Sequence, residues 1–470
     1  MPLRTLRSRL RLPTIVLAVF VAACGSDPTV PIDRSRERAG ASASADVSPA
    51  AVPEVVAAVL SGNAQAIAAA SFLVPPGAPL APFVEARLYA IANIAMHDAL
   101  NAIHPRYERY ALSTTAVPGA SPAAAVLSAA HDAVVAAAPG AQAVTDQWYA
   151  TEIAPLLGRP GVNEGITIGA QAAAAIVARR AADGTAGGGV APYTPGAAIG
   201  DYQFTFPFNT PAFDFFGTGG FADGSVWGST VTPFVVSSTA QFRAPPPYGA
   251  SSNPAAVLTS QYTRDFLEVQ ALGCATCPAR TAEQGEIAMF WVESSPAAWN
   301  RIARTVATLR RLNAWDTARL FALLQMAEFD VYATTMESKY HYNFWRPVTA
   351  IERAATDNNP ATTPSVGWDV VAFPTPPIPD YPSAHASAGG SAAAVLDAII
   401  RSPTSFSATS RSLPGVTRAF SSVSAAAREN ALSRIYVGYH FRHATEVGLR
   451  QGTNVGRHVA ASALGTALNR

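Results

Sequence analysis

The spacing of apolar residues predicts a chain built mainly from helices. Between positions 82 and 103, apolar residues recur at intervals of three and four, the period of an amphipathic helix. Helical spacing or high alanine content returns at 121–138, 163–183, 260–272, 281–291, 297–312, 316–338 and 384–400. No convincing alternating run of useful length indicates a strand. We therefore expect a mainly α fold, a bundle of about a dozen helices.

Several helix boundaries carry capping signals. Ser121 directly precedes a proline, which is typical of an N-cap, and Thr281 begins a capping box. We expect Asn163 and Asp316 to cap the helices that follow them. The helix that begins at Asp316 would present Lys339 at its C-terminal end.

The segment 184–254 interrupts the helical pattern. Gly and Pro recur every few residues, and aromatic residues lie between them. A connection of this length is unusual unless it is functional or packed. We predict a long ordered Pro/Gly-rich loop that wraps over the bundle and lines the entrance to a site. Within the first predicted helix, His97 and Asp98 favour a buried pair that holds helices together.

The first 23 residues resemble an export signal. Four arginines precede the apolar run 14–23, which is too short to span a membrane permanently. Residues 21–25 (VAACG) resemble a bacterial lipobox, with cleavage before Cys24 and lipidation of its thiol; an ordinary secretory signal is the alternative. Residues 24–52 would form a flexible tether and 53–470 the helical domain. We expect an exported, lipid-anchored protein on the periplasmic or cell-surface side.

Composition narrows the classes of function. The chain has 470 residues, 49% of them hydrophobic, which is enough for a large core. A net charge of +1 without a basic run argues against nucleic-acid binding. Cys274 and Cys277 could form a disulfide, a redox pair or half of a metal site. The spacing favours a disulfide within a loop.

Three short segments carry polar groups suited to binding an anion. Lys339 and Arg346 are separated by six residues and lie among aromatic residues. Burying positive charges in such surroundings costs free energy unless an anion pairs with them. Ser383, Ala384 and His385 begin a predicted helix, whose free N–H groups bind oxyanions. An N-cap serine beside an incidental histidine would explain that segment equally well.

Arg434 and His440 supply the third segment. They lie six positions apart, so an unbroken helix would point them away from each other. Gly438 between them permits a break that would let both side chains reach one site. The alternative for His440 is a core histidine, and His443 and His458 lie near it in the sequence.

The order and spacing of these segments resemble a known superfamily. The chain reads K-x6-R-P from Lys339, then P-S-A-H ending at His385, then S-R-x5-H ending at His440. This pattern is similar to that of the vanadium-dependent haloperoxidases and type 2 phosphatidic acid phosphatases (PAP2). The stretch YHYNFWRPVTAI looks most like the soluble bacterial haloperoxidase-like branch, and the similarity extends from about residue 83 to the C-terminus, with the anion-site core in 281–470.

The resemblance implies a role for each residue. Residues that would neutralise or hydrogen-bond vanadate or phosphate are Lys339, Arg346, Arg434, Ser383 and the Ala384 N–H. His440 would ligate vanadium, and His385 would act as the acid–base group. The implied activity is oxidation of halide by hydrogen peroxide. The alternative is a PAP2-type acid phosphatase that hydrolyses phosphomonoesters through a phospho-His440 intermediate.

The sequence departs from the superfamily pattern at two positions. Ala384 replaces a glycine but keeps the backbone N–H. Ala444 replaces an aspartate expected to orient the ligand histidine, which leaves Glu446, His443 or a backbone carbonyl as the orienting group. Separately, the residue seven positions before His385 influences halide preference in the family, and here it is Ile378, which is neither of the aromatic residues expected there.

Two further classes of protein remain open. A helical surface lipoprotein without activity would leave the buried cations unexplained. A zinc hydrolase could use His440, His443 and Glu446, but a cationic pocket repels a metal cation. The halide, the organic substrate and the oligomeric state do not follow from the sequence.

Overall fold

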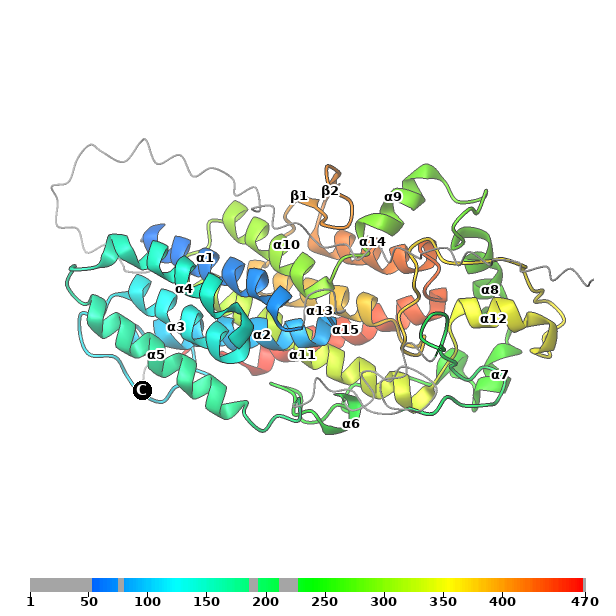
Figure 1. Ribbon diagram of the computed structural model, residues 1–470, viewed down its shortest axis with the longest axis horizontal. Helices are drawn as coiled ribbons and strands as arrows, with labels where there is room; N and C mark the ends of the chain where they lie inside the picture. The colour runs from blue at the N-terminus through cyan, green and yellow to red at the C-terminus, as the bar shows by residue number, and fades with distance from the viewer. Residues whose placement is uncertain (1–52, 75–79, 186–192, 211–226, 468–470) are drawn as a thin grey trace, which may run out of the picture.

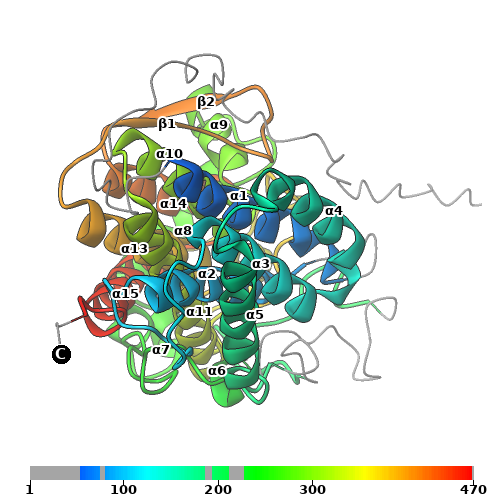
Figure 2. The ribbon, with the colours of Figure 1, turned by 90° about the vertical axis from the view of Figure 1, so that its left-hand side faces the viewer.

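The computed structural model describes residues 53–74, 80–185, 193–210, 227–467, and within these ranges the protein is mainly α. Figure 1 shows an elongated bundle, in which the long helices run along the long axis of the molecule. Viewed from one end, these helices surround a shared core (Figure 2). The mainly α fold predicted from the apolar spacing is confirmed.

The first half of the chain packs at one end of the bundle. Its helices are α1 (Pro53–Ala69), α2 (Pro82–Ile103), α3 (Pro122–Ala137), α4 (Gln142–Ile153) and α5 (Val162–Arg179). The segment Pro53–Phe72 is long and apolar enough to cross a membrane by length and composition alone. More than half of it is buried in the protein, however, and α1 packs against α2 and α3.

The second half of the chain completes the bundle and builds its other end. Its helices are α6 (Trp227–Thr230), α7 (Asn253–Val257), α8 (Ser260–Leu272), α9 (Ala282–Phe290), α10 (Ser295–Leu309), α11 (Ala314–Tyr342), α12 (Pro347–Arg353), α13 (Ala384–Ile400), α14 (Val423–Tyr436) and α15 (Arg442–Ser462). Helix α11 contacts α2, α13 and α15. It is buried on nearly every face, which marks it as the central helix.

A short hairpin departs from the sequence prediction. Strands β1 (Phe406–Thr409) and β2 (Thr417–Phe420) pair antiparallel, with Phe406 opposite Phe420. Each strand has only four residues, too few for the alternation of apolar and polar positions to be recognised in the sequence. The hairpin lies at the rim of the bundle, near α9 and α10 (Figure 2).

Two predicted caps are confirmed: the side chains of Ser121 and Thr281 accept hydrogen bonds from the N–H groups of the residues three positions later. The other two predictions are wrong. Gly161 with φ of 77° precedes α5, so Asn163 lies inside the helix. Asn313 caps α11 by accepting from the Asp316 N–H at 3.1 Å. In both cases an alternative residue slightly earlier in the chain starts the helix.

Helices α13 and α15 approach each other closely through small residues. A Cβ added to Gly452 would lie 1.8 Å from the backbone oxygen of Ser387, so only glycine fits there. Along the same face, Gly448 lies against the backbone of Ser383. This contact sets the start of α13 directly beside the start of α15.

The described parts of the segment 184–254 are packed on the bundle. Asp330 of α11 accepts hydrogen bonds from the N–H groups of three successive residues, Phe234, Val235 and Val236, at 2.6, 2.8 and 3.0 Å. The hydroxyls of Tyr342 and Tyr381 donate to carbonyls of the same segment, at Ala244 and Pro245. Residues 186–192 and 211–226 lie outside the described residues, as do the export signal, Cys24 and the tether.

A second buried aspartate has the same role as Asp330. Asp98 accepts hydrogen bonds from the N–H groups of Tyr110, Ala111 and Leu112, at 2.8, 2.6 and 2.9 Å. His97 Nδ1 lies 3.1 Å from Asp98 Oδ1. The pair is buried, as predicted, but the aspartate anchors a loop rather than joining two helices.

Cys274 and Cys277 form a disulfide in the loop between α8 and α9. Cys274 also pairs in an isolated bridge with Val370. The preceding residue, Gly273, has its carbonyl against Gly438, where an added Cβ would lie 2.3 Å away. The disulfide therefore lies next to the break between α14 and α15.

Glu328 in the middle of α11 provides a stability test. Its side chain is fully buried, neither carboxylate oxygen has a hydrogen-bond partner among the described residues, and burial raises its pKa well above the ordinary value. Above about pH 4.3 the unfolded chain releases this proton while the folded protein keeps it, so stability falls as pH rises.

We expect Glu328→Gln to gain stability relative to the wild type between pH 5 and pH 8, by up to about 1.4 kcal/mol for each pH unit. Thermal melts of both proteins at the two pH values measure the difference. An equal difference at both pH values would show that Glu328 is ionised in the folded protein.

Candidate functional site

The end of α11 places the first cation. Asn343 adopts a left-handed conformation with φ of 53° and ends the helix. Its N–H donates a hydrogen bond to the Lys339 carbonyl. Lys339 is fully buried in the last turn. Its Nζ donates to the carbonyls of Pro379 and Asp380, at 2.6 and 3.0 Å. The ammonium therefore holds the loop that precedes α13.

Arg346 lies at the start of α12 and is 1% exposed. Its Nε donates to the Ile378 carbonyl at 2.7 Å, and one terminal nitrogen donates to the Tyr439 carbonyl at 2.9 Å. The same terminal nitrogen lies 3.0 Å from His440 Nε2. Arg346 thus joins the loop before α13 to the chain break that carries His440.

The start of α13 contributes Ser383 and Ala384. Ser383 is the N-cap, with its side chain accepting from the Ala386 N–H at 3.4 Å, and its own N–H donates to the Ala444 carbonyl at 2.9 Å. Ala384 and His385 follow in the first turn, where backbone N–H groups lack partners within the helix. The helix start predicted at Ser383 is present, and its free N–H groups are of the kind that can bind an anion.

The break between α14 and α15 brings Arg434 and His440 together. Gly438 has φ of 89°, and the N–H groups of Tyr439 and His440 both donate to the Arg434 carbonyl. Arg434 is buried, donates to the Trp291 carbonyl at 2.9 Å and lies over the Tyr439 ring. The break predicted at Gly438 is confirmed.

The electrostatics show that the predicted cations converge on His440. Burial lowers the pKa of His440 well below its ordinary value, and the charges of Arg346, Lys339 and Arg434 lower it further. Burial lowers the pKa of Arg434 to about 10. Tyr439 acts in the opposite direction and raises this pKa, whereas repulsion from Arg346 lowers it further. His440 is therefore neutral at neutral pH, as a metal ligand or a nucleophile must be.

His385 enters the same environment from α13. Its Nδ1 lies 3.0 Å from the hydroxyl of Ser295, at the start of α10. Burial lowers its pKa well below the ordinary value, and Arg434 lowers it further. Ser295 is a neighbour that the sequence did not reveal, because 90 residues separate the two.

The sequence analysis also missed Asp380. This residue is 1% exposed, and its Oδ1 lies 2.8 Å from His440 Nδ1. Burial raises the pKa of Asp380 to about 7, against the opposing charges of Arg346 and Lys339. The available signal was a lone acidic residue among prolines and apolar residues, two positions before the proline of P-S-A-H.

None of the orienting groups proposed for His440 occupies that role. His443 accepts from the Tyr248 N–H and stacks on the rings of Tyr248 and Tyr381. Glu446 lies 3.8 Å from Arg442. The Ala444 carbonyl accepts from Ser383. The zinc alternative needs His440, His443 and Glu446 around one metal ion. Within the described residues, no three His, Cys, Asp or Glu side chains gather as a metal site.

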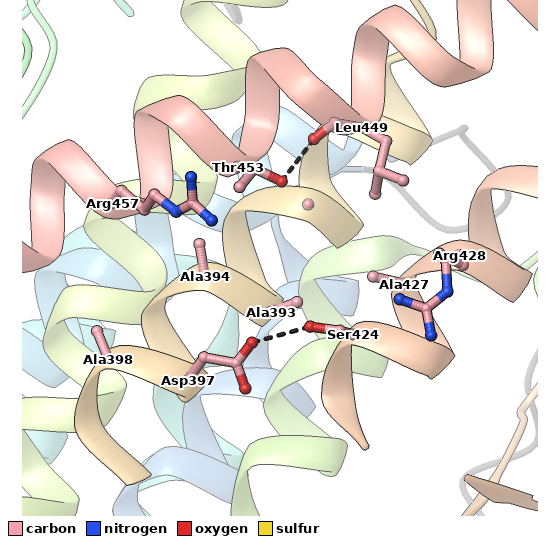
Figure 3. A pocket seen from close by; sticks show the side chains of 11 residues that line it. Ala393, Ala394, Asp397, Ala398, Ser424, Ala427, Arg428, Leu449, Thr453 and Arg457 are labelled. Carbon is pink, nitrogen blue, oxygen red and sulfur yellow. Dashed lines mark hydrogen bonds between the residues drawn. The ribbon is translucent and has the colours of Figure 1, made fainter. Parts of the chain in front are cut away.

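A groove on another face is separate from these residues. It lies between α13, α14 and α15, and Figure 3 shows small side chains such as Ala393 and Ala394 on its floor. Asp397 accepts a hydrogen bond from the Ser424 hydroxyl at 2.8 Å at one edge, and Arg428 and Arg457 lie along its sides. None of the predicted site residues lines it.

The balance of charge at His440 fits a bound oxyanion. Three buried cations, Lys339, Arg346 and Arg434, act on the buried His440, and the buried carboxylate of Asp380 contacts its ring. The Arg434 Nε is buried without a hydrogen-bond partner among the described residues. An uncompensated buried cation costs several kcal/mol, which a polyanion such as vanadate or phosphate would offset. The fold and the site thus define a mainly α protein with a cluster of buried cations around His440, which we call the cage.

Comparisons with known proteins relate the second half of the chain to the vanadium chloroperoxidases. Residues 319–467, which contain every residue of the cage, match the family model for the VCPO second helical-bundle domain. The vanadium chloroperoxidase of Curvularia inaequalis is 26% identical over 281 residues; the match covers 46% of this chain and 45% of that protein. Residues 319–467 are thus similar to a domain of the vanadium chloroperoxidases, and the comparisons support the resemblance to the vanadium-dependent haloperoxidases. The match spans about half the length of the curated relative.

Solved structures share the fold. A bacterial vanadium-dependent iodoperoxidase superimposes with a TM-score of 0.70 at 23% identity, covering 89% of this chain and 98% of the other. The holo form of a bacterial vanadium-dependent chloroperoxidase gives a TM-score of 0.60 at 16% identity, covering 83% and 94%. The apo form of a bacterial chloroperoxidase of this type gives 0.61 at 16% identity, covering 82% and 94%.

Proposed function

We propose that this protein is a vanadium-dependent haloperoxidase, which oxidises halide with hydrogen peroxide at a vanadate held by the cage. The observation that carries the proposal is the gathering of three buried cations, Lys339, Arg346 and Arg434, around the neutral His440. The similarity to vanadium chloroperoxidase and the shared fold with two bacterial haloperoxidases support the choice of vanadate.

The chain's own residues would hold the cofactor in a defined way. Lys339, Arg346 and Arg434 would neutralise its oxygens, and Ser383 and the Ala384 N–H would donate hydrogen bonds. His440 would ligate vanadium through Nε2. When bound, vanadate supplies the Lewis acid that activates peroxide toward halide.

His385 would act as the general base that accepts the proton of the peroxide. Its lowered pKa keeps the ring neutral and able to accept a proton. Ser295 at 3.0 Å from Nδ1 restricts the orientation of the ring. The buried site excludes bulk water, which strengthens each of these polar interactions.

Phosphatase chemistry is the second candidate, because the same residues would also bind phosphate. A carboxylate 2.8 Å from His440 Nδ1 would suit a nucleophilic histidine as well as a ligand. His440 would then attack phosphorus, and His385 would protonate the leaving alcohol. The donor set does not distinguish the two tetrahedral anions.

One experiment separates the two functions. The purified protein is incubated with vanadate, hydrogen peroxide and chloride, bromide or iodide, and halogenation of a phenol is measured beside hydrolysis of a phosphate monoester. Vanadate-dependent halogenation is the expected result. Phosphate-ester hydrolysis that vanadate inhibits, without halogenation, would assign the protein to the phosphatases.

We also propose that the protein is exported and anchored by lipid at Cys24. Residues 21–25 support this, and one acylated terminus would leave the domain in the aqueous phase. Cys24→Ser should move the protein from the membrane fraction to the soluble fraction, as measured by immunoblot. A wild-type protein that already fractionates as soluble would contradict the anchor.

A further inference from the structure

A carboxylate from a distant segment of the chain contacts the His440 ring. Asp380 belongs to the loop before α13, whereas the superfamily pattern would place an aspartate at the position of Ala444, in the first turn of α15. Asp380 Oδ1 lies 2.8 Å from His440 Nδ1, although 60 residues separate the two in the sequence. Both side chains are buried.

The loop that carries Asp380 is held on several sides. The carbonyls of Ile378, Pro379 and Asp380 accept hydrogen bonds from the cage cations, Arg346 and Lys339. The Asp380 N–H donates to the Phe344 carbonyl at 2.8 Å. The cations that surround the anion site therefore also fix the position of the carboxylate beside His440.

Geometry and ligand chemistry together assign a role to this contact. A histidine that coordinates through Nε2 needs its proton on Nδ1, and an acceptor beside Nδ1 selects that tautomer and fixes the ring. We propose that Asp380 is the positioning residue for His440, replacing from the loop before α13 the carboxylate that Ala444 lacks. This inference rests on the proposed function, since it treats His440 as the group that binds the oxyanion.

The first test measures the histidine ring without any bound anion. Nitrogen NMR of histidine-labelled protein, with His440→Gln for assignment, should show His440 protonated at Nδ1 in the wild type. Asp380→Asn should change this signal, because an amide can donate to Nδ1 and shift the proton to Nε2. A wild-type ring protonated at Nε2 would overturn the proposal even if the variant does not fold.

The second test measures binding. Asp380→Asn should weaken vanadate binding about 10- to 100-fold in calorimetric titration. Asp265→Asn is the matched control: Asp265 is also a buried carboxylate, but it accepts from the His443 N–H and the Tyr248 hydroxyl. That variant should keep both the vanadate affinity and the His440 signal.

The two tests fail in distinguishable ways. An unchanged His440 signal and unchanged vanadate affinity in a folded Asp380→Asn protein would reject the positioning role. Equal losses of affinity in Asp380→Asn and Asp265→Asn, with the His440 signal unchanged in both, would also reject it as a general effect of removing buried charge. A wild type that shows the Nδ1–H signal but binds no vanadate would support the contact and reject the proposed cofactor.

Discussion

Replacing His440 with alanine should abolish vanadate binding and halide oxidation together, whereas His385→Ala should slow turnover and leave most of the vanadate affinity. His440 is the neutral ring on which the buried cations converge, so its loss removes the ligand itself. Without His385, the three cations and the start of α13 still hold the anion. General acid–base groups contribute about 10²- to 10⁴-fold in rate, and we expect a loss of that size in His385→Ala.

Calorimetric vanadate titration and bromide-dependent halogenation of a phenol measure the two effects separately. His443→Ala is the matched control, because His443 lies three residues after His440 but stacks between Tyr248 and Tyr381. It should retain both binding and activity. If His385→Ala loses vanadate while His440→Ala keeps it, the roles of the two histidines are reversed.

The second large effect concerns Arg346. Vanadate or phosphate should raise the melting temperature of the wild type, and the two should compete for one site. At a ligand concentration of about 100 times Kd, the stabilisation is about 2.7 kcal/mol. Arg346→Ala should abolish this shift, because it removes a buried charge next to His440 Nε2 and releases the Ile378 and Tyr439 carbonyls.

Arg180→Ala controls for the loss of a structural arginine. Arg180 is also buried and donates to a backbone carbonyl, that of Pro233, at 3.1 Å, far along the chain from the cage. Its replacement should lower the melting temperature without changing the increment produced by vanadate. A wild type whose melting temperature responds to neither anion would reject the oxyanion cage.

Much of the fold could be predicted from the sequence, because helices and their ends depend on the spacing and type of residues that are close together in the chain. The apolar spacing located α2 and α8, and the hydroxyls of Ser121 and Thr281 marked two helix starts. Gly438 predicted the break between α14 and α15, because a break of this kind uses a positive φ, which favours a residue without Cβ. Errors arose where two polar residues competed for one cap, as Asn313 and Asp316 do.

The residues of the candidate site were also accessible from the sequence, through the order of three short blocks around Lys339, Ser383 and Arg434. Their chemistry alone suggested an anion, because clustered cations among aromatics need a counter-charge. The structure adds that Lys339 and Arg346 bind carbonyls of the loop 378–380 as well. The sequence could not show this, since backbone carbonyls carry no residue identity.

Sequence by itself determined the class of fold, the helix starts at Ser121 and Thr281, and the set of charges that would surround an oxyanion. These features follow from periodicity, capping and side-chain type. Tertiary structure alone decided which carboxylate faces His440. His443 and Glu446 lie close to His440 in the sequence, but the carboxylate that contacts its ring, at 2.8 Å, is that of the distant Asp380. The close packing of α15 on α13 at Gly452, and the cations that hold the loop before α13, bring together groups 60 residues apart.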